Sequence, residues 1–291
     1  MRPKEVARAV ELACILEVTA PKPGNVNRQH DFDDTTYEDF ILSAWASAPV
    51  FSRSEELSVG QLILEGVRAA QHMVSCNTNL GILLLLAPLA KAALISSGAL
   101  SLRNRLSLVL DELTVADAKE VYLAIREAKA GGLGEVSQQD VSGEPTVSLR
   151  AVMELARHRD SIAAEYCSGY TYTFTIGVPA LQKALRTYNH WSIAVVKAYL
   201  VLLAAVPDTL IARKAGWQRA KEVSQQVQRV LTVGALDTHA GQQELAALDN
   251  YLRSEGNRLN PGTTADLITA SIFVLLLLEG YGPFFGQKKG C

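Results

Sequence analysis

The sequence has few cysteines, and they lie far apart. Its 291 residues include four, Cys14, Cys76, Cys167 and Cys291, with no Cys-x-x-Cys spacing. This argues against a disulfide framework and against a cysteine-based zinc site, and it favours a reducing compartment. The first five residues lack the character of a signal peptide, so we expect a cytoplasmic protein.

An excess of either charge is also lacking. Lys and Arg number 28, and Asp and Glu number 30, for a formal net charge of −2. No basic surplus is available to attract nucleic acid or an anionic membrane, and neither is expected as a partner. The two longest apolar runs, residues 80–90 and 267–278, are shorter than the ~18 to 20 residues that span a bilayer. They predict central helices of a soluble core.

Apolar residues recur at helical spacing along nearly the whole chain. We therefore expect an all-α protein with a single domain, residues 1–291, of roughly ten to twelve helices. Residues 281–291 are predicted to be a frayed tail. The predicted helices cover residues 5–18, 36–48 after an N-cap at Thr35, 59–72 after Ser58, 80–94, 115–130 after Thr114, 148–159, 161–188 with a break near Gly169, 191–206 after Asn189, 217–231, 238–253 and the second apolar run. The glycine-rich Gly131–Glu135 follows a helix, so it is not a phosphate-binding P-loop.

The first candidate site is a loop near the N-terminus, in which Pro21 and Pro23 enclose Lys22. Each proline fixes φ at about −65° and holds the preceding residue extended. Gly24 then permits a turn that other residues resist. We call residues 20–27 the hook. Three carboxylates follow within residues 31–34, and cations near carboxylates suit a site for phosphate and a divalent metal. The alternative is a surface turn followed by solvated charges.

Three further polar segments lie at helix ends: residues 77–79, 208–214 and 260–266. The first precedes an apolar helix, where free backbone N–H groups favour an anion. Each segment also has a simpler interpretation. Residues 77–79 would be ordinary N-caps, Asp266 would complete a cap begun at Thr263, and the basic pair at 213–214 would lie on a solvated helix face.

Together the four segments resemble the triphosphoribosyl-dephospho-CoA synthase family. The shared pattern is Pro-Lys-Pro-Gly, then Asn-Thr-x-x-Gly, then Asp-Thr with a basic pair downstream, then Asn-Pro-Gly-x-x-Ala-Asp-Leu, in this order from about residue 13 to 280. The resemblance implies an all-α enzyme that uses ATP as a glycosyl donor. In that family the ribose 2′-hydroxyl of dephospho-CoA attacks C1′ of ATP, and adenine leaves.

The resemblance implies a site formed by helix-end loops, with ATP as substrate, Mg²⁺, and an acceptor such as dephospho-CoA. A homodimer is considered as an oligomeric form. The expected bases are Asp208 and Asp266. Mg²⁺ would be held by Asp31, Asp34 and Asp208. The expected nucleotide-binding residues are Lys22, Gly24, Asn25, Asn77, Thr78, Asn79, Arg213, Lys214, Asn260, Gly262 and Thr263. We expect the four segments to converge on one pocket.

The sequence also departs from the family pattern. Asn79-Leu80 stands where family members carry His-Lys, and the hook continues Asn25-Val26-Asn27 in place of Leu-Val-Asp. A cation and a carboxylate are thus missing beside the expected ligands. This affects the expected binding of the acceptor more than that of the donor, ATP. Three alternatives therefore stay open: a phosphoribosyl-type transferase of another cofactor pathway, such as tetrahydromethanopterin synthesis; a non-catalytic nucleotide-binding helical protein; and a helical scaffold. A scaffold predicts an exposed apolar groove and no clustering of the four segments.

Overall fold

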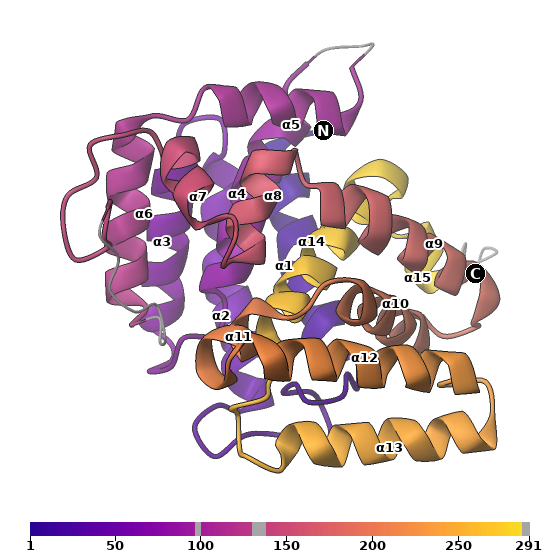
Figure 1. Ribbon diagram of the computed structural model, residues 1–291. Helices are drawn as coiled ribbons and strands as arrows, with labels where there is room; N and C mark the ends of the chain where they lie inside the picture. The colour runs from indigo at the N-terminus through magenta and orange to yellow at the C-terminus, as the bar shows by residue number, and fades with distance from the viewer. Residues whose placement is uncertain (97–99, 130–137, 287–291) are drawn as a thin grey trace. The chain divides into compact units, whose positions relative to one another are not determined.

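The structure, a computed structural model, describes residues 1–96, 100–129 and 138–286. Within these residues it has fifteen α-helices, a 3-10 helix (η1), a π-helix (η2) and no β-strand, which confirms the all-α prediction (Figure 1). The count exceeds the predicted one because three short helices were missed and the predicted helix 161–188 is two helices. The segment Gly131–Glu135 lies outside the described residues.

The chain divides into two compact units, each built from two stretches. Unit 1 comprises Met1–Ile15 and Glu38–Thr171, and unit 2 comprises Leu16–Tyr37 and Tyr172–Cys291. Helix α1 (Pro3–Thr19) contributes to both. The other helices of unit 1 are α2 (Tyr37–Ser47), η1 (Ala48–Arg53), α3 (Val59–Gln71), α4 (Leu80–Leu94), α5 (Leu102–Asp111), α6 (Val115–Glu127), α7 (Leu149–Ala156) and α8 (Ser161–Ser168). Those of unit 2 are η2 (Thr173–Gly177), α9 (Val178–Thr187), α10 (Trp191–Ala205), α11 (Thr209–Ala215), α12 (Trp217–Val233), α13 (His239–Arg253), α14 (Gly262–Glu279) and α15 (Gly282–Phe285). The single domain stays a prediction.

Local capping signals set several helix boundaries as predicted. Ser58 and Thr114 each form a reciprocal capping box at the start of α3 and α6. Gly169 ends α8 with a φ of 64°, a left-handed conformation that glycine adopts at low cost. Two predicted caps are wrong: α2 begins at Tyr37, beyond Thr35, and α10 is capped by His190 rather than Asn189.

In unit 1, the apolar helix α4 contains an internal proline, Pro88. Proline lacks an N–H and crowds the carbonyl four residues earlier, so this turn of the helix loses a hydrogen bond. Two buried tyrosines supply donors there. The hydroxyl of Tyr166 donates to the Leu84 carbonyl at 2.7 Å, and that of Tyr170 donates to the Leu85 carbonyl at 3.0 Å. These contacts fasten the end of α8 to the middle of α4.

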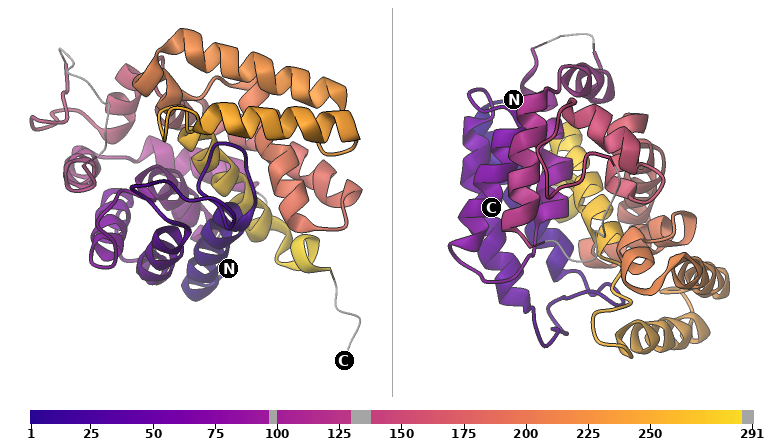
Figure 2. Two further views of the ribbon diagram at one scale, coloured as in Figure 1. Left: turned by 90° about the horizontal axis from the view of Figure 1, so that it is seen from below. Right: turned by 60° about the vertical axis from the view of Figure 1, so that its left-hand side comes forward.

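In unit 2, the apolar helices α10 and α14 pack against each other and against α9 and η2. Helices α12 and α13 lie side by side as an antiparallel pair (Figures 1 and 2). Helix α14 has 18 residues and a mean hydropathy of 1.6, so by length and composition it could cross a membrane. The predicted apolar run, residues 267–278, forms the C-terminal part of this longer helix. Because 67% of α14 is buried inside the protein, it has the character of the predicted core helix.

Two other features concern apolar segments and the C-terminus. Helices α10 and α11 meet the membrane-span criteria only as a pair, with a 58° bend between them. The short helix α15 forms at the start of the segment predicted to be a frayed tail, and the fraying itself stays a prediction. Residues 287–291 lie outside the described residues.

Candidate functional site

The hook follows α1, and its lysine is buried rather than exposed. The Lys22 ammonium is 0% exposed and pairs with the Glu17 carboxylate, which is 4% exposed, at 3.0 Å. It also donates to the backbone carbonyls of Glu17 and Ala20. Burial lowers the pKa of Lys22, and the carboxylate beside it opposes this shift. The donors of Lys22 are thus directed inward at protein oxygens, and its role as a phosphate ligand stays a prediction.

The backbone of the hook is held by side chains from α10 and α13. Tyr199 donates its hydroxyl hydrogen to the Pro23 carbonyl at 2.9 Å, and the Gly24 N–H donates to Asp249 at 2.7 Å. Gly24 has a φ of 74°, and a Cβ there would lie 2.7 Å from Leu252. The role of Gly24 is therefore conformational: no other residue fits this turn without strain.

Two asparagines join the hook to the segment before α14. The amide of Asn25, which is buried, donates to the side-chain oxygen of Asn260, which is half-buried. Arg253 on α13 donates to the Asn25 carbonyl at 2.6 Å and to Asp249 at 2.8 Å. The first and last polar segments are therefore in direct contact, although 235 residues separate the two asparagines.

Asp208 is a buried cap that links two helix N-termini. One carboxylate oxygen accepts from the N–H groups of Leu210 and Ile211 in α11. The other accepts from the N–H of Thr264 in α14 at 2.7 Å and from its hydroxyl at 2.8 Å. Burial raises the pKa of Asp208, and these hydrogen bonds oppose the shift.

A carboxylate offers about four lone-pair sites, and Asp208 has four donors. All four sites are thus used by protein donors, and the roles of Asp208 as a base and as a metal ligand stay predictions. As the negative group at two helix N-termini, it already fills the anion position expected for ligand phosphate. Thr263 is likewise used internally, since it is buried with its hydroxyl 3.2 Å from that of Thr209.

The basic pair at the end of α11 lies beside an asparagine and a carboxylate. Lys214 donates to the backbone and side-chain oxygens of Asn257, at 3.2 and 3.1 Å. The amide of Asn257 in turn donates to Asp34 at 2.7 Å. Burial lowers the pKa of Lys214, Asp34 opposes this shift, and Arg213 adds to it. Arg213 is half-buried, and its charge also acts on Asp208.

The predicted metal ligands do not form a cluster. Asp31 is exposed and accepts the first N–H of α2, and Asp34 is exposed beside Asn257. In the part of the chain that the structure describes, no three His, Cys, Asp or Glu side chains are grouped so that they could hold a metal ion. Asp208 is bound to the two helices, and partial coordination of Mg²⁺ by Asp31, Asp34 and Asp208, together with phosphate and water, stays a prediction.

The remaining predicted site residues lie at the start of α14 or, in unit 1, before α4. Gly262 begins α14, and a Cβ there would meet Leu210 at 2.5 Å. Asp266 is half-buried one turn later. In unit 1, Asn77 is exposed and accepts the Leu80 N–H at 3.4 Å, which is the simpler, capping interpretation.

The side chains after Asn77 bind within unit 1. The hydroxyl of Thr78 donates to Ser43 at 2.6 Å, and the amide of the buried Asn79 donates to Ser47 at 3.1 Å. Both side chains therefore fasten the start of α4 to α2, which contradicts their prediction as free nucleotide ligands. Convergence of this segment with the other three stays a prediction.

Sequence reasoning missed several residues that hold these groups in place: Glu17, Tyr199, Asp249, Arg253, Asn257 and Thr264. One signal was available, because Asp249 and Arg253 are four residues apart on a predicted helix, a spacing that brings opposite charges together. The others have no local signal, since their partners are distant in sequence or fixed by the fold.

The chain matches the protein family described as ATP:dephospho-CoA triphosphoribosyl transferase (CitG) over residues 3–284. A Pseudomonas putida protein named "Probable 2-(5''-triphosphoribosyl)-3'-dephosphocoenzyme-A synthase" is 27% identical over 289 residues, 92% of each chain. A protein of the same name from Pseudomonas syringae pv. syringae is 27% identical over 172 residues, 57% of this chain. The chain spans 56% and 48% of the lengths of the two Pseudomonas syringae relatives from pathovars syringae and tomato.

A crystal structure from Archaeoglobus fulgidus, of a protein named for triphosphoribosyl-dephospho-coA synthase, has the same fold. The TM-score is 0.61 at 24% identity, and the alignment covers 81% of this chain and 98% of that one.

Proposed function

Because this chain belongs to the ATP:dephospho-CoA triphosphoribosyl transferase family, we propose that it transfers a triphosphoribosyl group from ATP to an acceptor hydroxyl and releases adenine. One observation supports the proposal beyond the family: hydrogen bonds within unit 2 join the first and the third polar segments to the fourth. Asn25 bonds Asn260, Asp208 bonds Thr264, and Lys214 bonds Asn257. A scaffold would not require such clustering.

The reaction requires a new bond between the acceptor oxygen and C1′ of ATP, while the bond from C1′ to adenine N9 breaks. The electron pair of that bond leaves with adenine, and the proton of the acceptor hydroxyl is balanced by a proton taken up by adenine. Such displacements pass through an oxocarbenium-like state. The protein must therefore hold the triphosphate, accept a proton and stabilise the departing base.

The residues divide between these tasks as follows. Arg213 and Lys214 are the cations for the triphosphate, in place of the buried Lys22. Asp266, half-buried in the first turns of α14, is the proposed general base, because a carboxylate can accept the proton of the acceptor hydroxyl. The half-buried Asn260 offers an amide to the departing adenine.

Mg²⁺ fits this arrangement only as a phosphate-bound ion. It usually keeps several waters and takes one or two carboxylates together with substrate phosphates. Asp34, and with it Asp31, would supply such carboxylate oxygens, and the ion would neutralise charge on the triphosphate when bound.

The acceptor is proposed to be dephospho-CoA or a related hydroxyl compound in the cytoplasm. The loss of the His-Lys pair at Asn79-Leu80 supports a different acceptor, including one from another cofactor pathway. The use of Thr78 and Asn79 in contacts with α2 favours a second candidate function, a nucleotide-binding protein without transfer activity.

Mass spectrometry after incubation with ATP, Mg²⁺ and candidate acceptors tests the proposal. The expected result is adenine together with an acceptor heavier by one triphosphoribosyl group, both dependent on the acceptor. Asp266→Asn is the inactive comparison, and Asp160→Asn, a helix cap in unit 1, is the matched control. ATP binding without adenine release from any acceptor would favour the non-catalytic alternative.

A further inference from the structure

Lys214 is held by neutral oxygens only. Its ammonium has three donors, and two of them point to the backbone and side-chain oxygens of Asn257. Among the described residues it makes no ion pair, and Arg213 beside it adds a second positive charge. A half-buried cation whose hydrogen bonds go to neutral oxygens can still attract an anion, although the negative charge of Asp34 acts on Lys214 as well.

Asn257 connects this cation to a carboxylate. Its side-chain oxygen accepts from Lys214 at 3.1 Å, while its side-chain nitrogen donates to Asp34 at 2.7 Å. One amide thus fixes both charged groups and keeps them from closing into an ion pair with each other. Arg258 donates to the Lys214 backbone carbonyl at 3.2 Å and holds the end of α11 to the same loop.

We propose that Asn257 is a positioning residue that holds Lys214 and Asp34 apart as the two halves of a site for metal-bound polyphosphate. Lys214 binds a phosphate oxygen through its third N–H, and Asp34 binds the divalent cation that the polyphosphate carries. This deepens the proposed function, on which it rests, by assigning the triphosphate of ATP to this surface. A phosphate oxygen is negative and its bound cation is positive. Because Asn257 keeps Lys214 and Asp34 apart, Lys214 can bind the phosphate oxygen while Asp34 binds the cation.

Calorimetric titration of the full chain with inorganic tripolyphosphate, with and without Mg²⁺, tests this assignment without adenine or ribose. Lys214→Met should weaken binding about 10- to 100-fold in both conditions, because a charge-assisted contact is lost. Asp34→Asn should remove the gain in affinity from Mg²⁺ and leave binding without Mg²⁺ nearly unchanged.

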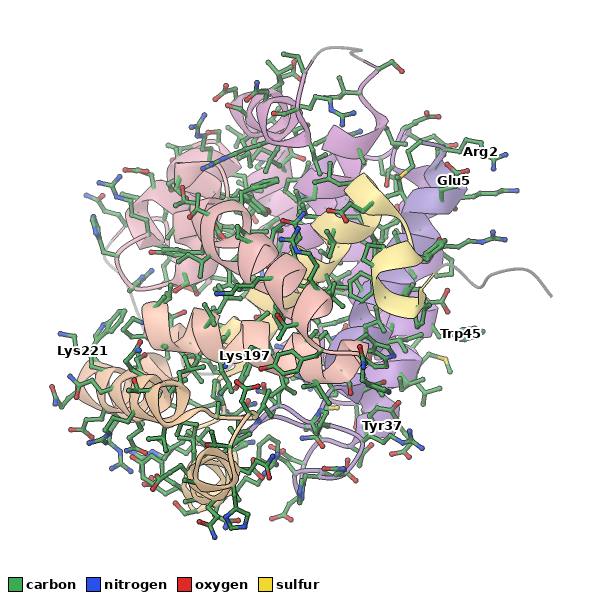
Figure 3. All side chains as sticks on the ribbon, turned by 90° about the vertical axis from the view of Figure 1, so that its right-hand side faces the viewer. Arg2, Glu5, Tyr37, Trp45, Lys197 and Lys221 are labelled. Atoms are coloured by element: carbon green, nitrogen blue, oxygen red, sulfur yellow. The ribbon has the colours of Figure 1, made fainter. Side chains whose placement is uncertain are left out.

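Asn257→Ala should weaken tripolyphosphate binding with and without Mg²⁺. In the absence of Mg²⁺, the double variant Lys214→Met with Asn257→Ala should bind no more weakly than Lys214→Met alone. That non-additivity separates positioning from a general loss of structure. The controls are Lys221→Met, whose side chain on α12 points away from the protein (Figure 3), and Asp33→Asn, an exposed neighbour of Asp34. Both should bind as the unmodified chain does.

Normal binding by Lys214→Met, or an equal loss for Asp34→Asn with and without Mg²⁺, would overturn the assignment. Adenine release is scored separately. Binding as predicted without adenine release refutes the transfer and leaves this site standing, whereas adenine release with unaffected binding in all three variants refutes this site alone.

Discussion

Replacing Lys22 by Met tests whether the hook is a buried ion pair or a phosphate ligand. The change keeps the length and the apolar stem of the side chain and removes only the ammonium. Glu17, 3.0 Å away and 4% exposed, is then left as a buried charge without a partner. Removing one member of a buried pair typically costs ~3 to 5 kcal/mol, which is a large part of the ~5 to 15 kcal/mol that stabilises a domain.

The loss should depend on pH, and its sign follows from Glu17. Burial already raises the pKa of this carboxyl, and Lys22 is the group that opposes the shift. Without Lys22 the pKa in the folded protein rises further above the ordinary value of 4.5. A raised pKa means that folding favours the protonated acid, so its contribution is present below that ordinary value and is lost as pH rises through the folded pKa. The variant should therefore be least destabilised in mild acid and most destabilised at pH ~8.

Urea denaturation followed by circular dichroism, at pH ~5 and pH ~8, measures both effects. Glu17→Gln combined with Lys22→Met is the control, because it removes both charges and should recover part of the lost stability. A free energy of unfolding within about 1 kcal/mol of the unmodified chain at both pH values would refute the buried-pair argument. Weaker ATP binding in a fully stable variant would restore Lys22 as a phosphate ligand.

Four further variants and one control variant, Tyr188→Phe, test other parts of the structure. Asp208→Asn should cost ~1 to 3 kcal/mol in urea denaturation, because one oxygen that accepts from α11 or α14 becomes a donor; no loss would mean that the two helix ends are joined by other contacts. Gly24→Ala should lower the melting temperature by the equivalent of more than about 1 kcal/mol, since φ is 74° and Leu252 lies 2.7 Å from the new Cβ; an unchanged melting temperature would contradict the tight turn. Tyr166→Phe should cost ~1 to 3 kcal/mol by leaving the Leu84 carbonyl unpaired, whereas Tyr188→Phe, whose hydroxyl bonds the exposed Asp237, should cost less than about 0.5 kcal/mol. Asp266→Asn should lower the rate of adenine release ~100-fold while ATP affinity changes little; equal rates would exclude it as the base.

Local sequence determined where many helices begin and end. The boxes at Ser58 and Thr114 close within three residues, and the left-handed turn at Gly169 depends on that residue alone. Such signals are present in the chain before any tertiary contact forms. At the two positions where the predicted cap, Thr35 or Asn189, is not used, Asp31 accepts the first N–H of α2 and His190 caps α10.

The roles of the polar residues were decided by tertiary structure. The sequence placed Lys22 and Asp208 at helix ends, and residue type suggested ligands for phosphate and metal. Only the fold surrounds Lys22 with Glu17 and the carbonyls of its own turn, and only the fold brings Thr264, 56 residues away, to Asp208. A buried charge must be satisfied by whatever protein groups surround it, so its role depends on partners whose proximity the folded chain alone establishes.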